Sequence, residues 1–293
     1  MGDFGTAEKR ILNFMLKGTV FEYNNKQYEV QFSDKPTCSK GEPKTDIYIL
    51  AKSDEDTIEI KISYKKENAD FIENKMSVER AEQLFGDEWS DIIKRSTKAV
   101  QDKFFQRMLI YKNKFKKTQK GSITLGWKFE LLNKKSGDLS GKMLLTYGQI
   151  LDVYAGSNLS LDKRNALVCG QVIENSGVAN YLLMDEDIHS AQDVVDRMIP
   201  ISDYIMMYPD IYFACKALNY RTFSKKWDGN RPLSVQVKWN EIDNKLAPEL
   251  IFDKPLIVKG NEVAERLIYY MNKLNIKDTN DINESNLGTD KIV

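Results

Sequence analysis

The 293-residue sequence has only three cysteines and one histidine. Cys38, Cys169 and Cys215 are far apart and none stands at metal-ligand spacing, so neither a structural zinc site nor a disulfide framework is expected. The single histidine, His189, has no second imidazole near it in the sequence. A metal centre built on histidines is therefore not expected, and a Ser or Cys triad would have only this base.

Net charge and long apolar runs are also missing. Formal charge is zero, from 43 basic and 43 acidic residues, so nucleic-acid binding would have to come from local clusters of charge. No window approaches the ~18 apolar residues of a membrane span, and the first residues contain no apolar core of a signal peptide. No G-x-x-x-x-G-K-[ST] motif is present. We expect a cytoplasmic protein without membrane contact or nucleotide cofactor.

The hydrophobic fraction of 42% allows a substantial core. Helical periodicity at residues 6–17 is followed by alternating runs typical of strands, and then by further helical segments. This succession predicts an α/β fold with a mixed sheet. We expect a catalytic core over residues 1–120, an integrated second α/β lobe over residues 121–276, and a polar C-terminal tail over residues 277–293.

The segment "DIYILAKSDEDTIEIKIS" contains two apolar runs around a charged turn. Its alternating isoleucines place Glu59, Lys61 and Ser63 together on the opposite face of the second strand. If the strands are antiparallel, Asp46 at the head of the first is expected to approach Glu59 and Lys61. Carboxylates suit Mg²⁺, and a lysine beside them can orient or deprotonate a water, or neutralise charge on a phosphate. The alternative is a solvated sheet face with ordinary cross-strand pairs.

Asp46, twelve intervening residues and then Glu59-Ile60-Lys61 resemble the signature of the PD-(D/E)XK nuclease superfamily, with Thr45 in place of its proline. The resemblance covers roughly residues 5–115. It implies an αβββαβ core with the acid on the second strand and E-x-K on the third, and Mg²⁺-dependent cleavage of DNA. Asp46 and Glu59 would then be metal ligands, and Lys61 the catalytic lysine.

Two further residues extend this predicted site. Glu8 stands on the first helix, where many members of the superfamily carry another acid, although a solvated glutamate at a helix start is an equal alternative. Ser63 continues the face of Glu59 and Lys61, so we expect it to contact the scissile phosphate or a metal-bound water.

Candidate DNA contacts follow in three groups, and a plain solvated surface is the alternative for each. Lys65, Lys66 and Asn68 come directly after the predicted site. Residues 94–120 contain ten basic residues and one acid, and the positive charge is densest near the end of this segment. The residues expected there are Lys112, Lys114, Lys116 and Lys117. The segment "YRTFSKKWDGNRPLSVQ" adds residue types that read base edges; these are Arg221, Lys225, Lys226, Asn230, Arg231 and Gln236.

These patterns predict a type II restriction endonuclease that hydrolyses double-stranded DNA with Mg²⁺. Two active sites cut two strands, so a homodimer is expected. One alternative is a nuclease selective for DNA structure, of the repair, resolvase or phage type. Another is a non-catalytic DNA-binding protein, in which alanine would be tolerated at Asp46, Glu59 and Lys61.

Overall fold

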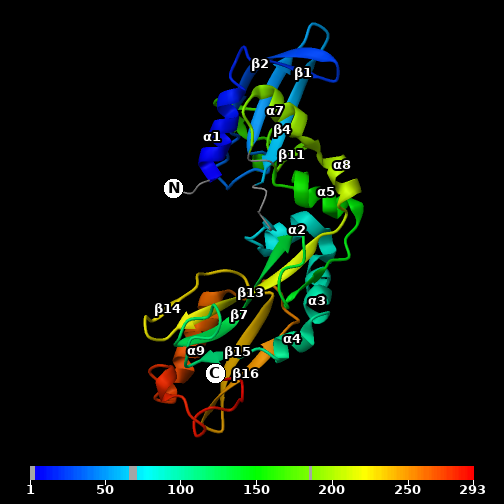
Figure 1. Ribbon diagram of the computed structural model, residues 1–293. Coiled ribbons are helices and arrows are strands. Elements are labelled where there is room, and N and C mark those ends of the chain that lie inside the picture. Colours follow the sequence, from blue (N-terminus) through cyan, green and yellow to red (C-terminus); the bar gives the residue numbers. More distant parts are fainter. Residues whose placement is uncertain (1–3, 66–70, 185–186) are drawn as a thin grey trace. The chain divides into compact units, whose positions relative to one another are not determined.

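The computed structural model describes residues 4–65, 71–184 and 187–293. The chain forms two compact units, and each is built from two separate segments (Figure 1). Unit 1 comprises Met1–Asp70 and Leu145–Asp210, and unit 2 comprises Phe71–Leu144 and Ile211–Val293. Both units combine helices with strands, so the predicted α/β class is confirmed. No helix in the described ranges is long and apolar enough to cross a membrane.

Unit 1 contains a six-stranded mixed sheet in the order β1-β2-β3-β4-β11-β12. Its strands are β1 (Val20–Tyr23), β2 (Lys26–Asp34), β3 (Ile47–Lys52), β4 (Thr57–Tyr64), β11 (Tyr181–Leu183) and β12 (Ile199–Pro200). Its helices are α1 (Phe4–Phe14), α5 (Tyr147–Ala155), α6 (Leu161–Arg164), α7 (Ala191–Arg197) and α8 (Ile201–Met207). A small antiparallel pair, β9 (Leu167–Val168) and β10 (Gln171–Val172), lies outside this sheet. Strand β11 runs parallel to β4, and the other pairs are antiparallel.

One face of the β3–β4 pair makes the core of unit 1. Alternation puts Ile47 and Ile49 of β3 on the same face as Ile60 of β4, and all three are almost fully buried. They belong to one apolar cluster with Ile11 of α1 and Val194 of α7. The charged residues at alternate positions of β4 are therefore directed to the opposite face. The sequence prediction of two separate faces is confirmed.

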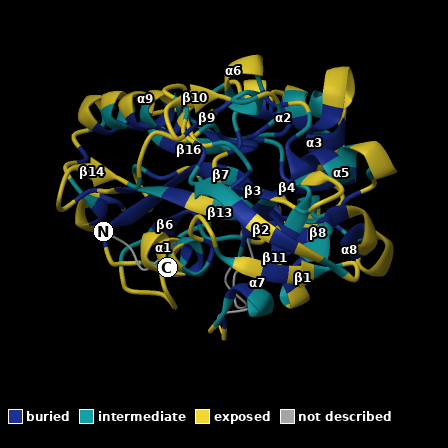
Figure 2. Ribbon diagram, turned by 90° about the horizontal axis from the view of Figure 1, so that it is seen from above, coloured by how far each residue is buried: buried dark blue, intermediate teal, exposed yellow. Residues whose placement is uncertain are grey.

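Unit 2 is built around the long antiparallel pair β7 (Ser122–Leu132) and β13 (Tyr212–Arg221). The other strands of its sheet are β5 (Phe71–Glu73), β6 (Ile110–Tyr111), β8 (Ser140–Lys142), β14 (Lys226–Trp227), β15 (Val235–Ile242) and β16 (Lys245–Ile251). Its helices are α2 (Val78–Phe85), α3 (Trp89–Lys98), α4 (Gln101–Phe105) and α9 (Gly260–Lys273), with short 3₁₀ turns η1 (Gly86–Glu88) and η2 (Thr279–Asp281). Figure 2 shows the outer face of α9 exposed, while β7 is buried along nearly its whole length.

The C-terminal residues belong to unit 2. Ile282 is fully buried, and Leu287 forms a bridge with Leu246 of β16. The backbone carbonyl of Val293 accepts a 2.6 Å hydrogen bond from the Lys112 N–H. Residues 277–293, expected as a polar tail, therefore pack against the strands of unit 2. Backbone hydrogen bonds and a few buried apolar side chains make these contacts despite the polar composition.

The expected boundary at residue 120 falls inside unit 2. Helices α2, α3 and α4, expected to complete the core that begins with α1, belong to unit 2 as well. In unit 1 the helix that follows β4 is α5, after residues 71–144 have formed part of the other unit. Local periodicity does not show which unit an element joins, and for that reason the interleaved arrangement was missed.

Candidate active site

Strands β3 and β4 fix the positions of the predicted acids. Their ladder pairs Leu50 with Glu59, and the Asp46 N–H donates a 2.8 Å hydrogen bond to the carbonyl of Ile62. Asp46 lies just before this ladder with its carboxylate beside Ser63, and Ser63 is four residues along β4 from Glu59. At about 3.3 Å per residue this is roughly 13 Å between backbone positions. The two acids share a face, as predicted, but stand at separate places on it.

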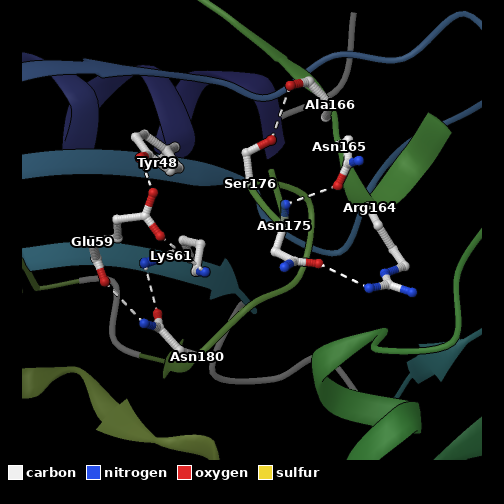
Figure 3. Close-up of polar contacts among 9 residues, drawn as sticks. All are labelled: Tyr48, Glu59, Lys61, Arg164, Asn165, Ala166, Asn175, Ser176 and Asn180. Carbon is white, nitrogen blue, oxygen red and sulfur yellow. Dashed lines mark hydrogen bonds and ion pairs between the residues drawn. The ribbon is translucent and has the colours of Figure 1, made fainter. Parts of the chain in front are cut away.

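Glu59 and Lys61 take part in a local network with Tyr48 (Figure 3). The Tyr48 hydroxyl donates a 2.5 Å hydrogen bond to Glu59 Oε1, and Lys61 Nζ lies 3.4 Å from Glu59 Oε2. The Lys61 side chain is only 13% exposed. Burial and the bonded Glu59 carboxylate both raise the pKa of Tyr48 above its ordinary value, so the hydroxyl stays a donor. Both oxygens of Glu59 thus have partners within the protein.

Asn180 holds the backbone of β4 at this network. Its Oδ1 accepts a 2.7 Å hydrogen bond from the Lys61 N–H, and its Nδ2 donates at 2.9 Å to the Glu59 carbonyl. The Asn180 N–H also donates at 2.9 Å to the Lys61 carbonyl. The side-chain contacts are drawn in Figure 3. Asn180 immediately precedes β11, and nothing in its sequence context indicates a partner so far away along the chain.

The loop that leads to Asn180 is itself fixed by polar contacts (Figure 3). An Arg164 terminal nitrogen donates to Asn175 Oδ1 at 3.1 Å, and the Asn175 N–H donates to Asn165 Oδ1 at 2.9 Å. The buried Ser176 hydroxyl donates to the Ala166 carbonyl at 2.9 Å. These bonds tie the loop to residues 164–166.

Gly177 connects this loop to the start of β3. Its carbonyl accepts hydrogen bonds from the N–H groups of Lys44 and Thr45, at 3.0 and 3.2 Å. Its own N–H donates to the Arg164 carbonyl at 2.8 Å. The same loop therefore positions the residues just before Asp46 and, through Asn180, the middle of β4.

Asp46 is the centre of a second charged group. Its Oδ2 accepts a 2.8 Å hydrogen bond from the Tyr64 N–H and lies 3.5 Å from the Ser63 hydroxyl. Lys65 Nζ is 3.8 Å from the same oxygen. Burial raises the pKa of Asp46 above its ordinary value, the Lys65 ammonium works against this, and the Glu8 carboxylate adds to it. The structure thus brings together Asp46, Ser63 and Lys65 from the predicted residues.

Glu8 lies beside this group, in an ion pair that the sequence did not predict. Lys35, the residue after β2, places its Nζ 2.5 Å from Glu8 Oε2, and the Glu8 side chain is only 12% exposed. Burial disfavours the charged form of Lys35, but the bonded Glu8 carboxylate leaves the pKa of the ammonium above its ordinary value. The charges of both Glu8 and Lys35 act on the carboxyl group of Asp46. We call Glu8, Lys35, Asp46, Ser63 and Lys65 the Asp46 cluster.

The Asp46 cluster offers two carboxylates to a cation. Within the described part of the chain, no group of three or more His, Cys, Asp and Glu side chains is arranged to hold a metal. Mg²⁺, however, is commonly bound through one or two carboxylates, with waters and substrate phosphates as its other ligands. Among the described residues, the three Asp46 contacts all fall on Oδ2, which leaves Oδ1 for a further ligand. The donor set of Glu8 and Asp46 fits such a site.

Most of the predicted DNA contacts lie in unit 2. Five of them lie on the β13–β14 hairpin and the loop after it, and all five are exposed: Arg221, Lys225, Lys226, Asn230 and Arg231. Arg221 is paired with Asp228 at 2.5 Å. Gln236 lies in the interior of β15, paired with Gly126 and Ile251, and is half-buried. Lys66 and Asn68 lie outside the described residues.

The two basic segments of unit 2 leave its sheet at the same end. Tyr111 of β6 and Arg221 of β13 both pair with Ser122 of β7. Beyond this point Lys120 Nζ lies 5.6 Å from the centre of the Phe223 ring. The exposed lysines 114, 116 and 117 and the half-buried Lys112 therefore lie in the segment beside the hairpin with Lys225 and Lys226. We call these six lysines the basic end.

No family model matches the sequence, and no curated protein or solved structure matches it. Function therefore has to be inferred from the chemistry of the Asp46 cluster and of the basic end.

Proposed function

We propose that the protein is a Mg²⁺-dependent endonuclease that cuts double-stranded DNA in the manner of a type II restriction enzyme. The observation that carries this proposal is the Asp46 cluster, in which a largely buried carboxylate lies 3.8 Å from a lysine ammonium and beside a second, buried acid. Burying a carboxylate costs free energy of folding unless an opposite charge or a hydrogen bond offsets it. Buried ionisable groups beside a charged partner are concentrated at functional sites.

The topology of unit 1 supports the same proposal. When β1, α6 and the small β9–β10 pair are set aside, its elements α1, β2, β3, β4, α5 and β11 follow the αβββαβ order that the resemblance implies. If β2 is counted as the first strand of that core, Asp46 stands immediately before the second, β3. The E-x-K residues lie in the third, β4, and β11 is added parallel to it.

The Mg²⁺ site fits Glu8 and Asp46 best. When bound, Mg²⁺ would polarise the phosphodiester and lower the pKa of a coordinated water. Lys35 neutralises Glu8 and limits the repulsion between the two acids. The Tyr64 N–H and Ser63 hydroxyl keep the Asp46 carboxylate in one orientation. Glu8 and Asp46 would bind the ion, and the groups around them orient the two carboxylates. Together they supply the fixed charges and dipoles that a charged transition state requires.

DNA binding is assigned to the basic end of unit 2. Lysines on a loop and a neighbouring hairpin provide sequence-independent contacts with phosphates. Asn230 and Arg231 follow the hairpin and are of the types that read base edges, and these would supply specificity. Two copies of the chain would cut the two strands of a symmetric site, so the active species is proposed to be a homodimer.

A digest of a sequenced bacterial genome tests this function. The purified protein, incubated with the DNA and Mg²⁺, is expected to produce discrete fragments whose sequenced ends share one short motif. EDTA should abolish cutting, and sedimentation velocity should show a dimer on DNA. Intact DNA across such a broad range of sequences would contradict the proposal.

The other two functions predict different results in the same assay. A structure-selective nuclease would cut a four-way junction or flap in preference to linear duplex. A non-catalytic DNA-binding protein would shift the mobility of DNA without cutting it, and Asp46→Ala would leave that binding unchanged.

A further inference from the structure

Two lysines are candidates for the catalytic lysine, one within β4 and one directly after it. Lys61 belongs to the E-x-K pattern, whereas Lys65 directly follows β4. The backbone of Lys65 is fixed by β11, because its N–H donates a 2.9 Å hydrogen bond to the carbonyl of Leu183. Lys65 is therefore held in register by the sheet even though it lies just beyond β4.

The surroundings of Lys61 are those of a structural residue. Its Nζ pairs with Glu59, its N–H and carbonyl are bonded to Asn180, and its side chain is 13% exposed. Glu59 is also bonded to the buried Tyr48. The Lys61 side chain is also less exposed than that of Lys65, so its ammonium is the less accessible of the two to a phosphate. This network resembles a satisfied cross-strand cluster.

The surroundings of Lys65 are those of a reactive centre. Its ammonium donates a 3.2 Å hydrogen bond to the Tyr64 carbonyl and lies 3.8 Å from Asp46 Oδ2, just beyond a direct hydrogen bond. An ammonium has three donors, so others remain for a phosphate, and the side chain is 27% exposed. Asp46 is oriented separately by the Tyr64 N–H, so it does not depend on Lys65 for its position. Lys65 can therefore turn to a phosphate while Asp46 stays in place.

We propose that DNA hydrolysis takes place at the Asp46 cluster and that Lys65, not Lys61, is its catalytic lysine. The inference rests on the proposed nuclease function. In the reaction a water oxygen forms a bond to phosphorus, and the P–O bond to one sugar breaks. The net transfer of one proton from water to the leaving alkoxide completes hydrolysis. The Lys65 ammonium contacts the phosphate oxygens and stabilises the negative charge that builds up on them.

The same proposal separates the acids of this face. Glu8 and Asp46 are the metal-binding carboxylates, while Glu59 anchors Tyr48 and Lys61. Lys35 is a positioning residue, because it is bonded to Glu8 at 2.5 Å and neutralises it.

A matched pair of substitutions tests the lysine assignment. Lys65→Met and Lys61→Met each remove one ammonium and keep an unbranched side chain. Lys65→Met is expected to lower the single-turnover cleavage rate by a factor of about 100 to 1,000, as for the loss of one transition-state donor. Its affinity for DNA should change by less than a factor of about five, since one phosphate contact is lost among many. Lys61→Met should cut within a factor of about five of wild type.

Three outcomes decide between the possibilities. A loss of about a hundredfold or more in Lys61→Met, with circular dichroism and melting close to wild type, overturns the assignment whatever Lys65→Met does. Cutting by Lys65→Met at the wild-type rate also overturns it. Wild-type protein that cuts no DNA refutes the nuclease function itself and is thus distinguishable from both.

Binding of Mn²⁺ alone, followed by electron paramagnetic resonance, tests the acids without relying on activity. Asp46→Asn and Glu8→Gln should each weaken Mn²⁺ binding by about tenfold or more, because each removes a charged oxygen ligand. In Glu59→Gln the affinity for Mn²⁺ should stay within about twofold of the wild-type value. An equal loss of affinity in Glu59→Gln would place the metal elsewhere, and no saturable Mn²⁺ binding to wild type would overturn the metal site itself.

Discussion

Tyr48 and Glu59 are joined by a 2.5 Å hydrogen bond between neighbouring strands, with the tyrosine ring almost fully buried. Tyr48→Phe keeps the ring and removes the donor, so Glu59 Oε1 must turn to water. We expect a loss of about 1–2 kcal/mol in the free energy of unfolding, as for a hydrogen bond to a charged group. Urea unfolding measures it. Glu59→Gln, which keeps an acceptor for Tyr48, should lose less; an unchanged midpoint in Tyr48→Phe would contradict the network.

Asn180 bonds to β4 through both ends of its amide. Asn180→Ala removes the acceptor for the Lys61 N–H and the donor to the Glu59 carbonyl, and we expect a loss of about 1–3 kcal/mol. Hydrogen exchange at the Lys61 amide should accelerate more than at the centre of β7, in the other unit. Asn180→Asp keeps the acceptor and loses the donor, so its loss of stability should be intermediate. Equal exchange rates in wild type and Asn180→Ala would contradict the role of the Asn180 amide in holding β4.

Gly177 has no room for a side chain. A Cβ there would stand 1.9 Å from the Lys163 carbonyl oxygen and 2.9 Å from Pro43 Cβ. Gly177→Ala must therefore displace backbone, with an expected cost of at least about 1–3 kcal/mol. The Gly177 carbonyl also accepts hydrogen bonds from Lys44 and Thr45, which directly precede Asp46. The rate of DNA cleavage should therefore fall together with the free energy of unfolding.

Gly148 provides the control for this substitution. It lies in helix α5, and a Cβ added there would have no neighbouring atom within 4 Å, so Gly148→Ala should be neutral or stabilising by up to about 1 kcal/mol. Both variants are compared by urea unfolding. A Gly177→Ala protein as stable as Gly148→Ala would mean that the loop moves freely away from Lys163.

Period-two alternation was sufficient to predict the shared face of Asp46, Glu59, Lys61 and Ser63. It was not sufficient to predict which of them meet, because the register depends on the turn between β3 and β4. The ladder pairs Leu50 with Glu59, and the Asp46 carboxylate lies beside Ser63 and Tyr64 instead. The contacts of Asn180 and Lys35 join residues distant in sequence and follow from tertiary packing. They carry no local pattern, so sequence alone could not have found them.

Asp46 should couple stability to pH. Burial raises its folded-state pKa above the 3.8 of an ordinary Asp, whereas the unfolded chain keeps the ordinary value. Ionised Asp46 therefore lowers stability at pH values above the folded pKa, and this cost disappears as pH falls below 3.8. Asp46→Asn should melt at a higher temperature than wild type at neutral pH, and the difference should close in acid. A difference independent of pH would contradict this assignment.

The basic end should determine the salt dependence of DNA binding. Each neutralised phosphate contributes about 0.9 to the slope of log affinity against log salt concentration. Lys114→Ala combined with Lys117→Ala should reduce that slope by about 2 and weaken binding to all sequences alike. Both lysines lie on the segment beside the β13–β14 hairpin. Lys254, an exposed lysine between β16 and α9, serves as the control, and Lys254→Ala should leave the slope unchanged. Fluorescence anisotropy over a range of salt concentrations measures both, and an equal slope in the double variant and wild type would remove the basic end from the DNA interface.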